Sequence, residues 1–171
     1  MPDKKELFDF MLERVKFTQR ETGFAEPQAF GRWFLGMYFP NPQDVFVSDG
    51  SHDGKVDIFF TTHDGSTVTY HVLNSKYTRD YNKTAPVKFY EEITYFWRAF
   101  ENKGSREGYL AQAVKAELRP HYRRLFEAYD RDAARLMFVT NCRRNDNHYQ
   151  QVEGVPVELF HLDDLIQQLG Q

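Results

Sequence analysis

Residues 55–78 read KVDIFFTTHDGSTVTYHVLNSKYT, and this stretch decides the expected fold. Two runs rich in β-branched and aromatic residues lie on either side of HDGS, where Asp64-Gly65 is a strong signal for a tight hairpin turn. A turn centred between Asp64 and Gly65 places Asp57 across from Val72. The sequence therefore predicts an antiparallel β-hairpin that begins near Asp57 and ends near Lys76.

Side chains alternate along a strand, so this register assigns every residue of the hairpin to one of two faces. One face is expected to carry Asp57, Phe59, Thr61, Val68, Tyr70, Val72, Asn74 and Lys76. The other is expected to carry Val56, Ile58, Phe60 and Leu73. Apolar residues on both faces indicate a central, covered hairpin. Three polar groups gathered at one end of one face, Asp57, Asn74 and Lys76, therefore call for an explanation.

The rest of the chain alternates helical and strand patterns. Helices are predicted over residues 5–20, over 26–39 with Pro27 in the first turn, over 86–101, and over 107–130 with a kink at Pro120. RLMFVTN (135–141) and VPVELFHL (155–162) are typical of strands, and DDLIQQL (163–169) of a short helix. This order predicts an α/β fold in which a central sheet has helices on both faces.

Composition limits the class of protein. A chain of 171 residues, 41% hydrophobic and 16% aromatic, favours a single domain over residues 1–171. The longest apolar run, WFLGMYF (33–39), is too short to cross a bilayer, and the N-terminus lacks the apolar stretch of a secretory signal. One cysteine, Cys142, excludes an internal disulfide and a cysteine-based zinc site. We expect a soluble cytoplasmic protein without a membrane partner.

The cluster at the end of the hairpin has two interpretations. In the first, Lys76 and Asp57 form an ordinary ion pair, and Asn74 hydrogen-bonds to a turn. In the second, the cluster is a divalent-metal site: a carboxylate and a nearby carbonyl supply oxygen ligands for Mg²⁺ or Mn²⁺, and a lysine assists a bound water. The chain has no Gly-x-Ser-x-Gly elbow, phosphate loop or dinucleotide fingerprint, and its six histidines show no ligand spacing.

Asp57 followed after 16 intervening residues by Asn74-Ser75-Lys76 resembles the signature of the PD-(D/E)XK nuclease superfamily, an Asp on one strand and Glu-x-Lys on the next. Within that superfamily, SHDGKVDIFF (51–60) and HVLNSKYT (71–78) look like the N-terminal nuclease domain of abortive-infection phage-resistance (AIPR) proteins. They are more distantly similar to Mrr-type restriction endonuclease domains. The resemblance extends loosely over most of the chain and implies a restriction-endonuclease-like fold, a central mixed β-sheet flanked by helices.

Carried over residue by residue, the resemblance implies that Asp57 binds Mg²⁺ or Mn²⁺ and that Lys76 activates water or stabilises the transition state. Asn74 stands where the family has Glu or Gln, and because it brings no charge we expect weaker metal affinity unless another carboxylate compensates. Relatives often recruit a glutamate from the helix before the hairpin. Glu26 is the candidate for a catalytic third metal ligand, although its position equally suits helix capping. Gly31 occupies a helical position where relatives can carry that acid.

Two further acids, Asp49 and Asp53, lie within SDGSHDGKVD, where a simple turn is the simpler interpretation. The net charge of −3 gives no global sign of nucleic-acid binding. Residues 76–88 are nevertheless basic: they contain Lys76, Arg79, Lys83 and Lys88 against Asp80 alone. We therefore expect Arg79 and Lys83 to contact phosphates of a nucleic acid.

The resemblance implies a Mg²⁺-dependent DNA endonuclease, a phosphodiester hydrolase that acts in defence against phage or foreign DNA. The alternative is a catalytically decayed nuclease-fold module that binds nucleic acid or a protein partner. The choice between DNA and RNA stays open, and so does the oligomeric state, with a homodimer as one alternative. AIPR-like proteins usually continue well beyond such a domain, so a further C-terminal domain outside this chain is a second open point.

Overall fold

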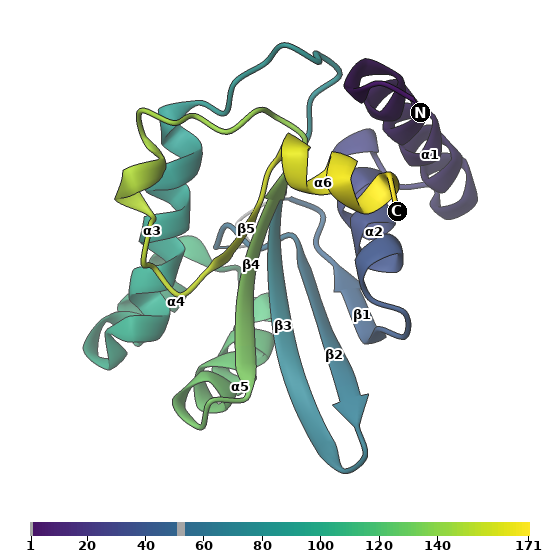
Figure 1. Cartoon of the computed structure of the whole chain (residues 1–171). Helices are drawn as coiled ribbons and strands as arrows, with labels where there is room; N and C mark the ends of the chain where they lie inside the picture. Colours follow the sequence, from purple (N-terminus) through teal and green to yellow (C-terminus); the bar gives the residue numbers. More distant parts are fainter. Residues whose placement is uncertain (1, 51–53) are drawn as a thin grey trace.

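The computed structural model describes residues 2–50 and 54–171, which form a five-stranded sheet between two groups of helices (Figure 1). The strands are β1 (Gln43–Val47), β2 (Ile58–Asp64), β3 (Thr67–Lys76), β4 (Ala134–Thr140) and β5 (Glu158–Phe160). The helices are α1 (Lys4–Thr22), α2 (Glu26–Tyr38), α3 (Val87–Glu101), α4 (Arg106–Ala113), α5 (Arg119–Asp130) and α6 (Leu162–Leu169). In the sheet order β1-β2-β3-β4-β5, the first three strands are antiparallel and β3, β4 and β5 are parallel. The predicted α/β fold with a mixed sheet is confirmed.

The hairpin exists as predicted, but its register differs from the predicted one. Asp64 pairs with Thr67 and Phe59 with Val72, so Asp57 does not face Val72. The turn is centred on Gly65-Ser66, and Gly65 adopts a φ of 61°. A glycine with positive φ at the first central position is what a type II′ hairpin turn requires. Because the difference amounts to two residues, the side chains of β2 and β3 keep their predicted faces. Val56, which precedes β2, does not: it was predicted on the face of Ile58 but packs in the cluster on the other side.

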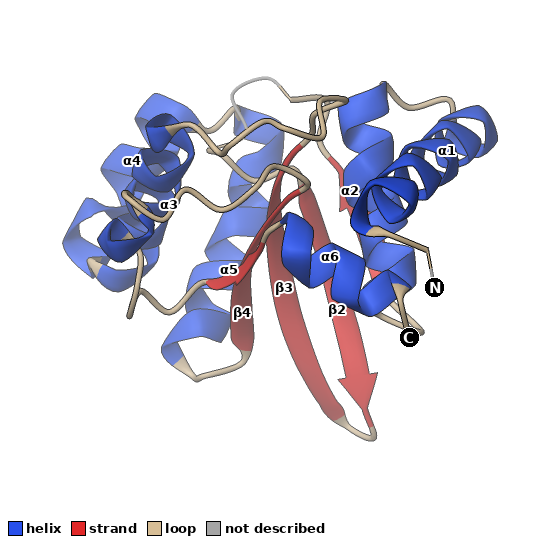
Figure 2. Cartoon of the chain, turned by 45° about the horizontal axis from the view of Figure 1, so that its top comes forward, coloured by secondary structure: helices blue, strands red, loops and turns tan. Residues whose placement is uncertain are grey.

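Each face of the sheet is covered by its own helices (Figure 2). Ile58, Phe60 and Leu73 pack with α1, α2 and α6 in one apolar cluster. Phe59, Val72 and Phe138 pack with α3, α4 and α5 in the other. The hairpin is therefore buried on both faces at the end away from its turn, which matches the apolar pattern of its two strands.

The remaining differences from prediction are local. Strand β1 follows Pro42 and was not predicted, because QDVFV is short and largely exposed. Pro120 does not kink a long helix; it lies in the first turn of α5, where its missing N–H costs nothing. In α1, Phe8, Met11 and Val15 are buried.

The C-terminal ends of β3 and β4 lie at the same edge of the sheet because these strands are parallel, with Lys76 beside Thr140. The turn between β2 and β3 lies at the opposite end of the molecule, as Figure 1 shows. Among the described residues, no helix combines the length and apolar character needed to span a membrane.

Candidate active site at the end of the hairpin

Asp57 directly precedes β2, and its carboxylate lies against the strand that carries the other motif residues. Its backbone N–H donates to the Leu73 carbonyl at 2.8 Å. Its Oδ2 accepts a hydrogen bond from the Ser75 backbone N–H at 2.7 Å. Ser75 lies between Asn74 and Lys76, so the structure brings Asp57 next to the predicted motif. The register that was predicted was wrong by two residues, yet the proximity that it implied is present.

Asn74 is the least satisfied polar residue of this region. Its side chain is 1% exposed, and neither Oδ1 nor Nδ2 has a hydrogen-bond partner among the described protein groups. Asn141, directly after β4, offers a matched contrast: it is fully buried too, but its amide accepts from Thr78 N–H at 2.8 Å and donates to the Thr78 carbonyl at 2.7 Å. Leaving a buried amide unpaired costs about 1–3 kcal/mol, so Asn74 needs a specific explanation.

Lys76, the last residue of β3, points to the α3 side of the sheet. Its ammonium nitrogen lies 2.8 Å from Glu92 Oε2 and over the Phe89 ring, 5.6 Å from the ring centroid. Among the described residues, the ion pair of Lys76 is with Glu92 and not with Asp57, so the simpler interpretation named the wrong partner. Lys55 approaches the other oxygen of the same carboxylate, with Nζ 3.6 Å from Oε1.

The segment before Asp57 is held by the helices of the α3 side. Gly54 and Lys55 are both left-handed, with φ of 66° and 69°. Gly54 N–H donates to the Ala113 carbonyl at 3.1 Å, and the Tyr109 hydroxyl donates to the Gly54 carbonyl. A Cβ at position 54 would collide with the hydroxyls of Tyr109 and Tyr122, so only glycine fits there.

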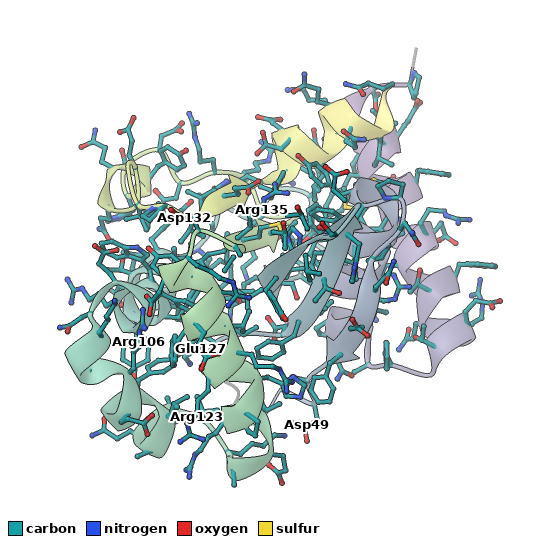
Figure 3. The ribbon with its side chains drawn as sticks, turned by 90° about the horizontal axis from the view of Figure 1, so that it is seen from below. Asp49, Arg106, Arg123, Glu127, Asp132 and Arg135 are labelled. Carbon is teal, nitrogen blue, oxygen red and sulfur yellow. The ribbon has the colours of Figure 1, made fainter. Side chains whose placement is uncertain are left out.

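Helices α4 and α5, which supply these tyrosines, are joined by a partly buried ion pair. Arg106 of α4 lies beside α5 in the view from below (Figure 3), and its guanidinium makes two hydrogen bonds of 2.8 Å with Asp130. A bidentate pair of this kind fixes both position and orientation. The contacts of Ala113, Tyr109 and Tyr122 with Gly54, called here the clamp on Gly54, are therefore made by two helices that are fixed to each other.

Glu26 lies on the opposite side of the sheet from Lys76. It begins α2, and its Oε1 accepts from the Tyr77 hydroxyl at 2.7 Å and from Arg79 Nε at 3.0 Å, while Arg79 Nη2 binds Oε2. Hydrogen bonding from Arg79 lowers the pKa of Glu26, and burial together with the Glu26 bond raises that of Tyr77. The structure therefore holds Glu26 in a satisfied ion pair and does not bring it to Lys76.

Gly31 lies under β3 on the same α2 side as Glu26. A Cβ placed on Gly31 would lie 3.0 Å from Ser75 Oγ and 3.1 Å from Ile58 Cδ1, which leaves little room for a longer side chain. The helix before the hairpin therefore brings an acid to β3 only through Glu26. Of the other acids considered, Asp49 binds Lys115 at 2.7 Å, and Asp53 lies outside the described residues.

The two predicted phosphate contacts differ in their surroundings. Arg79 is exposed but engaged by Glu26. Lys83 is exposed, and within residues 2–50 and 54–171 its ammonium takes part in no ion pair. The structure thus leaves Lys83 as the more accessible cation of this stretch.

Sequence reasoning missed Glu92, although a signal was present. Glu92 follows Phe89 by three positions and precedes Phe96 by four, so it lies on the apolar stripe of α3. A carboxylate on a buried helical stripe is rare unless it is paired. Its neighbour Glu91 is exposed, which shows how sharply one helical position separates the two acids.

The chemistry of this donor set suits one hard cation only if the substrate supplies ligands as well. In the described parts of the chain, no group of three or more His, Cys, Asp or Glu side chains is arranged to hold a metal. Mg²⁺ is commonly held by one or two carboxylates, with waters and substrate phosphates in the remaining positions. The Asp57 carboxylate and the unpaired Asn74 amide oxygen fit that description, whereas a zinc site would need more protein ligands.

Comparisons with known proteins give likenesses of fold alone. No family model matches the chain, and no curated protein matches it. Among solved structures, the DNA modification-dependent restriction endonuclease AspBHI is similar, with a TM-score of 0.48 and 17% identity over 99% of this chain. Restriction endonuclease FokI bound to DNA gives 0.49 and 12% over 96%, and MspJI in complex with a 27-mer oligonucleotide gives 0.40 and 13% over 96%. This chain spans 38%, 26% and 27% of those chains, and TM-scores below 0.5 do not establish a shared activity.

Proposed function

We propose that this chain is a metal-dependent phosphodiesterase domain that cleaves DNA, with Asp57, Asn74 and Lys76 at its active site. The observation that carries the proposal is Asn74, a buried residue with an unpaired amide that directly precedes Ser75, the hydrogen-bond donor to Asp57, and stands two residues before Lys76. Folding tolerates such a group when function requires it. Asn141 demonstrates that this fold can satisfy a buried asparagine at a neighbouring strand end when no ligand has to be bound.

Asp57 and the Asn74 amide oxygen are the protein ligands that would hold Mg²⁺ or Mn²⁺ at this edge of the sheet. A bound divalent ion supplies charge neutralisation at the phosphate and lowers the pKa of a coordinated water. The Ser75 N–H fixes the orientation of the Asp57 carboxylate through the 2.7 Å hydrogen bond to Oδ2. This bond holds Asp57 in place without any rearrangement of β3.

Hydrolysis of a phosphodiester adds one water across a P–O bond. The water oxygen bonds to phosphorus while the bond from phosphorus to the leaving oxygen breaks. One proton of the water passes to the leaving oxygen, which departs as an alcohol, and the other stays on the new phosphate group or is released to solvent. Lys76 carries the ammonium that would offset the negative charge developing on the phosphate. Its place at the C-terminal end of β3, 28% exposed, makes it accessible from solvent.

The choice of DNA rests on the resemblance of the motif to AIPR and Mrr-type domains, and the same resemblance supports a role in defence against phage or foreign DNA. The basic stretch after β3 supports a polyanionic substrate, because Lys83 and Lys88 are exposed next to the site. The alternative of a decayed module predicts that the chain binds nucleic acid or a protein but no divalent ion.

Titration calorimetry with Mn²⁺ and Mg²⁺ tests the proposal directly. Wild type should bind the ion, and Asp57→Asn should bind it at least about tenfold more weakly, because the amide can still accept from Ser75 but lacks the charge. Asp64→Asn, an exposed acid at the other end of the same strand, is the matched control and should bind like wild type. An absence of binding to wild type would overturn the proposal in favour of the decayed module.

A further inference from the structure

Among the described residues, most of the buried side-chain atoms without a hydrogen-bond partner lie on the α3 side of the sheet, while His71, which stacks on Phe60, lies on the other side. In the described part of the chain, five buried side-chain atoms lack a hydrogen-bond partner: His71 Nδ1, Asn74 Oδ1 and Nδ2, Glu92 Oε2 and Trp97 Nε1. Three of these belong to Asn74 and Glu92. Asn74 faces the α3 side because it shares that face with Lys76, which contacts Glu92. The concentration of unmet bonding capacity at this place points to a ligand that the two residues share.

Two lysines compensate the negative charge of Glu92, but Oε2 of its carboxylate accepts no hydrogen bond from a described protein group. Lys76 lies 2.8 Å from Oε2, yet the angles of this approach do not make a hydrogen bond. Lys55 stays 3.6 Å from Oε1. A largely buried carboxylate is costly unless it is both paired and hydrogen-bonded. Two ammonium groups at imperfect geometry therefore neutralise Glu92 without satisfying it.

Lys76 belongs to the motif, and Lys55 stands next to it in the sequence. Lys55 stands two residues before Asp57, and Lys76 stands two residues after Asn74, so contact with both fixes Glu92 beside the candidate site. Lys55 reaches the Glu92 carboxylate from a left-handed backbone, a conformation that is unfavourable for a residue with a side chain.

From these contacts we infer that Glu92 supplies the second carboxylate of the divalent-ion site, from the helix that follows the hairpin. The inference rests on the proposed function and names a ligand for it. It resolves the charge deficit that Asn74 creates, because Asp57 and Glu92 together provide the two carboxylates that Mg²⁺ commonly uses. Glu26 does not compete for this role, since Tyr77 and Arg79 hold it on the other side of the sheet.

The two ammonium groups occupy the place of the cation at Glu92 in the ion-free protein. When a divalent ion compensates Glu92, Lys76 no longer has to do so, and its ammonium becomes available to a phosphate oxygen. The same carboxylate thus links ion binding to the position of the lysine. Removing a competing ammonium should therefore favour ion binding, whereas removing the carboxylate should weaken it.

Mn²⁺ titration calorimetry on single variants tests the inference with a readout independent of cleavage. Glu92→Gln should weaken Mn²⁺ binding at least about tenfold, whereas Glu91→Gln, exposed on the same helix, and Glu26→Gln should stay within about twofold of wild type. Melting curves in chelator verify that each variant is folded.

A second pair of variants covers the case in which Glu92→Gln fails to fold. Lys55→Met removes an ammonium from Glu92 and should tighten Mn²⁺ binding several-fold more than Lys88→Met, which removes an exposed α3 charge with no ion pair among the described residues. If Asp57→Asn loses the ion while Glu92→Gln keeps it, or if the two lysine variants behave alike, Glu92 is not a ligand and the proposed function stands without it. If wild type itself binds no Mn²⁺, both the inference and the proposed function fall.

Discussion

The two sides of β3 near its C-terminal end carry ionic clusters of similar composition and different completeness. On the α2 side, the carboxylate of Glu26 accepts hydrogen bonds from Tyr77 and Arg79. On the α3 side, Glu92 contacts Lys55 and Lys76 without a hydrogen bond to Oε2, and the nearby Asn74 is unpaired. The carboxylate of the first cluster is hydrogen-bonded within the protein, whereas the second leaves Asn74 and Glu92 Oε2 without hydrogen-bond partners among the described groups, which is the basis of the proposed ion site.

This difference shows that a charged residue near a motif, or one with a shifted pKa, is not functional for that reason alone. The pKa of Glu26 is lowered, and the sequence named it as a candidate ligand, yet its hydrogen bond from Arg79 is the largest cause of that shift. What separates the α3 side is bonding capacity that the described protein groups leave unused.

The largest effect is expected for cleavage by variants of the α3 side. Asp57→Asn and Lys76→Arg should each reduce Mg²⁺-dependent plasmid cleavage by about 100-fold or more. The first substitution removes the carboxylate charge that would hold the ion, and the second moves the positive charge away from its position at the reacting phosphate. Lys76→Arg keeps a positive charge for Glu92, so its melting temperature should change little. Cleavage at the wild-type rate by either variant would place the active site elsewhere.

The two buried asparagines should respond oppositely to the same change. Asn141→Leu should destabilise the protein by about 1–3 kcal/mol, because it leaves the Thr78 N–H and carbonyl unpaired. Asn74→Leu should be neutral or stabilising, because it removes an amide without partners. Urea unfolding of both variants measures the difference, and equal losses of stability would mean that Asn74 is bonded after all.

Asn74→Glu adds a carboxylate beside Asp57 and should tighten Mg²⁺ binding by about tenfold. In chelator the variant should melt below wild type, because like charges repel in the ion-free site. Adding Mg²⁺ should relieve that repulsion and raise its melting temperature by more than that of wild type. A metal-dependent gain no larger than that of wild type would show that residue 74 does not reach the ion.

The α2 side should contribute stability that depends on pH. Arg79 keeps the pKa of Glu26 below its ordinary value of 4.5, so the stabilisation is present above that value and is lost as the pH falls through the lowered pKa. Glu26→Gln should therefore melt a few degrees below wild type at neutral pH, and the gap should close in acid. Glu21→Gln, an exposed acid of α1, serves as the control and should show no such gap.

The smallest effect concerns the basic stretch after β3. Lys83→Ala should weaken DNA binding a few-fold and reduce the salt slope by about one, as expected for one lost phosphate contact. Arg79→Ala should have less effect, because Glu26 already engages that guanidinium. Fluorescence anisotropy at several salt concentrations compares them, with Lys103→Ala as the distant control. An equal loss of DNA affinity in all three variants would show that the basic stretch after β3 does not contact DNA.

The hairpin, both helix-covered faces and the buried strand 134–140 could be predicted from the sequence, because alternating and helical patterns encode them locally. The register could not be fixed, since Asp64-Gly65 and Gly65-Ser66 both offer turn chemistry and only the packed sheet selects one. The predicted proximity of Asp57 to Asn74 is nevertheless present, because a change of two residues in the register keeps the open ends of the two hairpin strands side by side.

The partners of the motif depend on long-range packing, and this limited the prediction of the site. Glu26 looked available as a ligand because nothing local reveals that Arg79 and Tyr77 close on it from 53 and 51 residues away. Glu92 carried a readable signal, a charge on the apolar stripe of α3, but only the crossing of α3 over β3 shows which lysine it meets.

The clamp on Gly54 has a consequence for how the domain can be dissected and how it folds. Tyr109, 55 residues further along the chain, holds the backbone from which Asp57 emerges. A fragment that ends after β3 would contain every residue of the motif and yet lack the support that shapes it. During folding, the hairpin can form early from local contacts, whereas the site matures only when α4 and α5 dock and close that long loop.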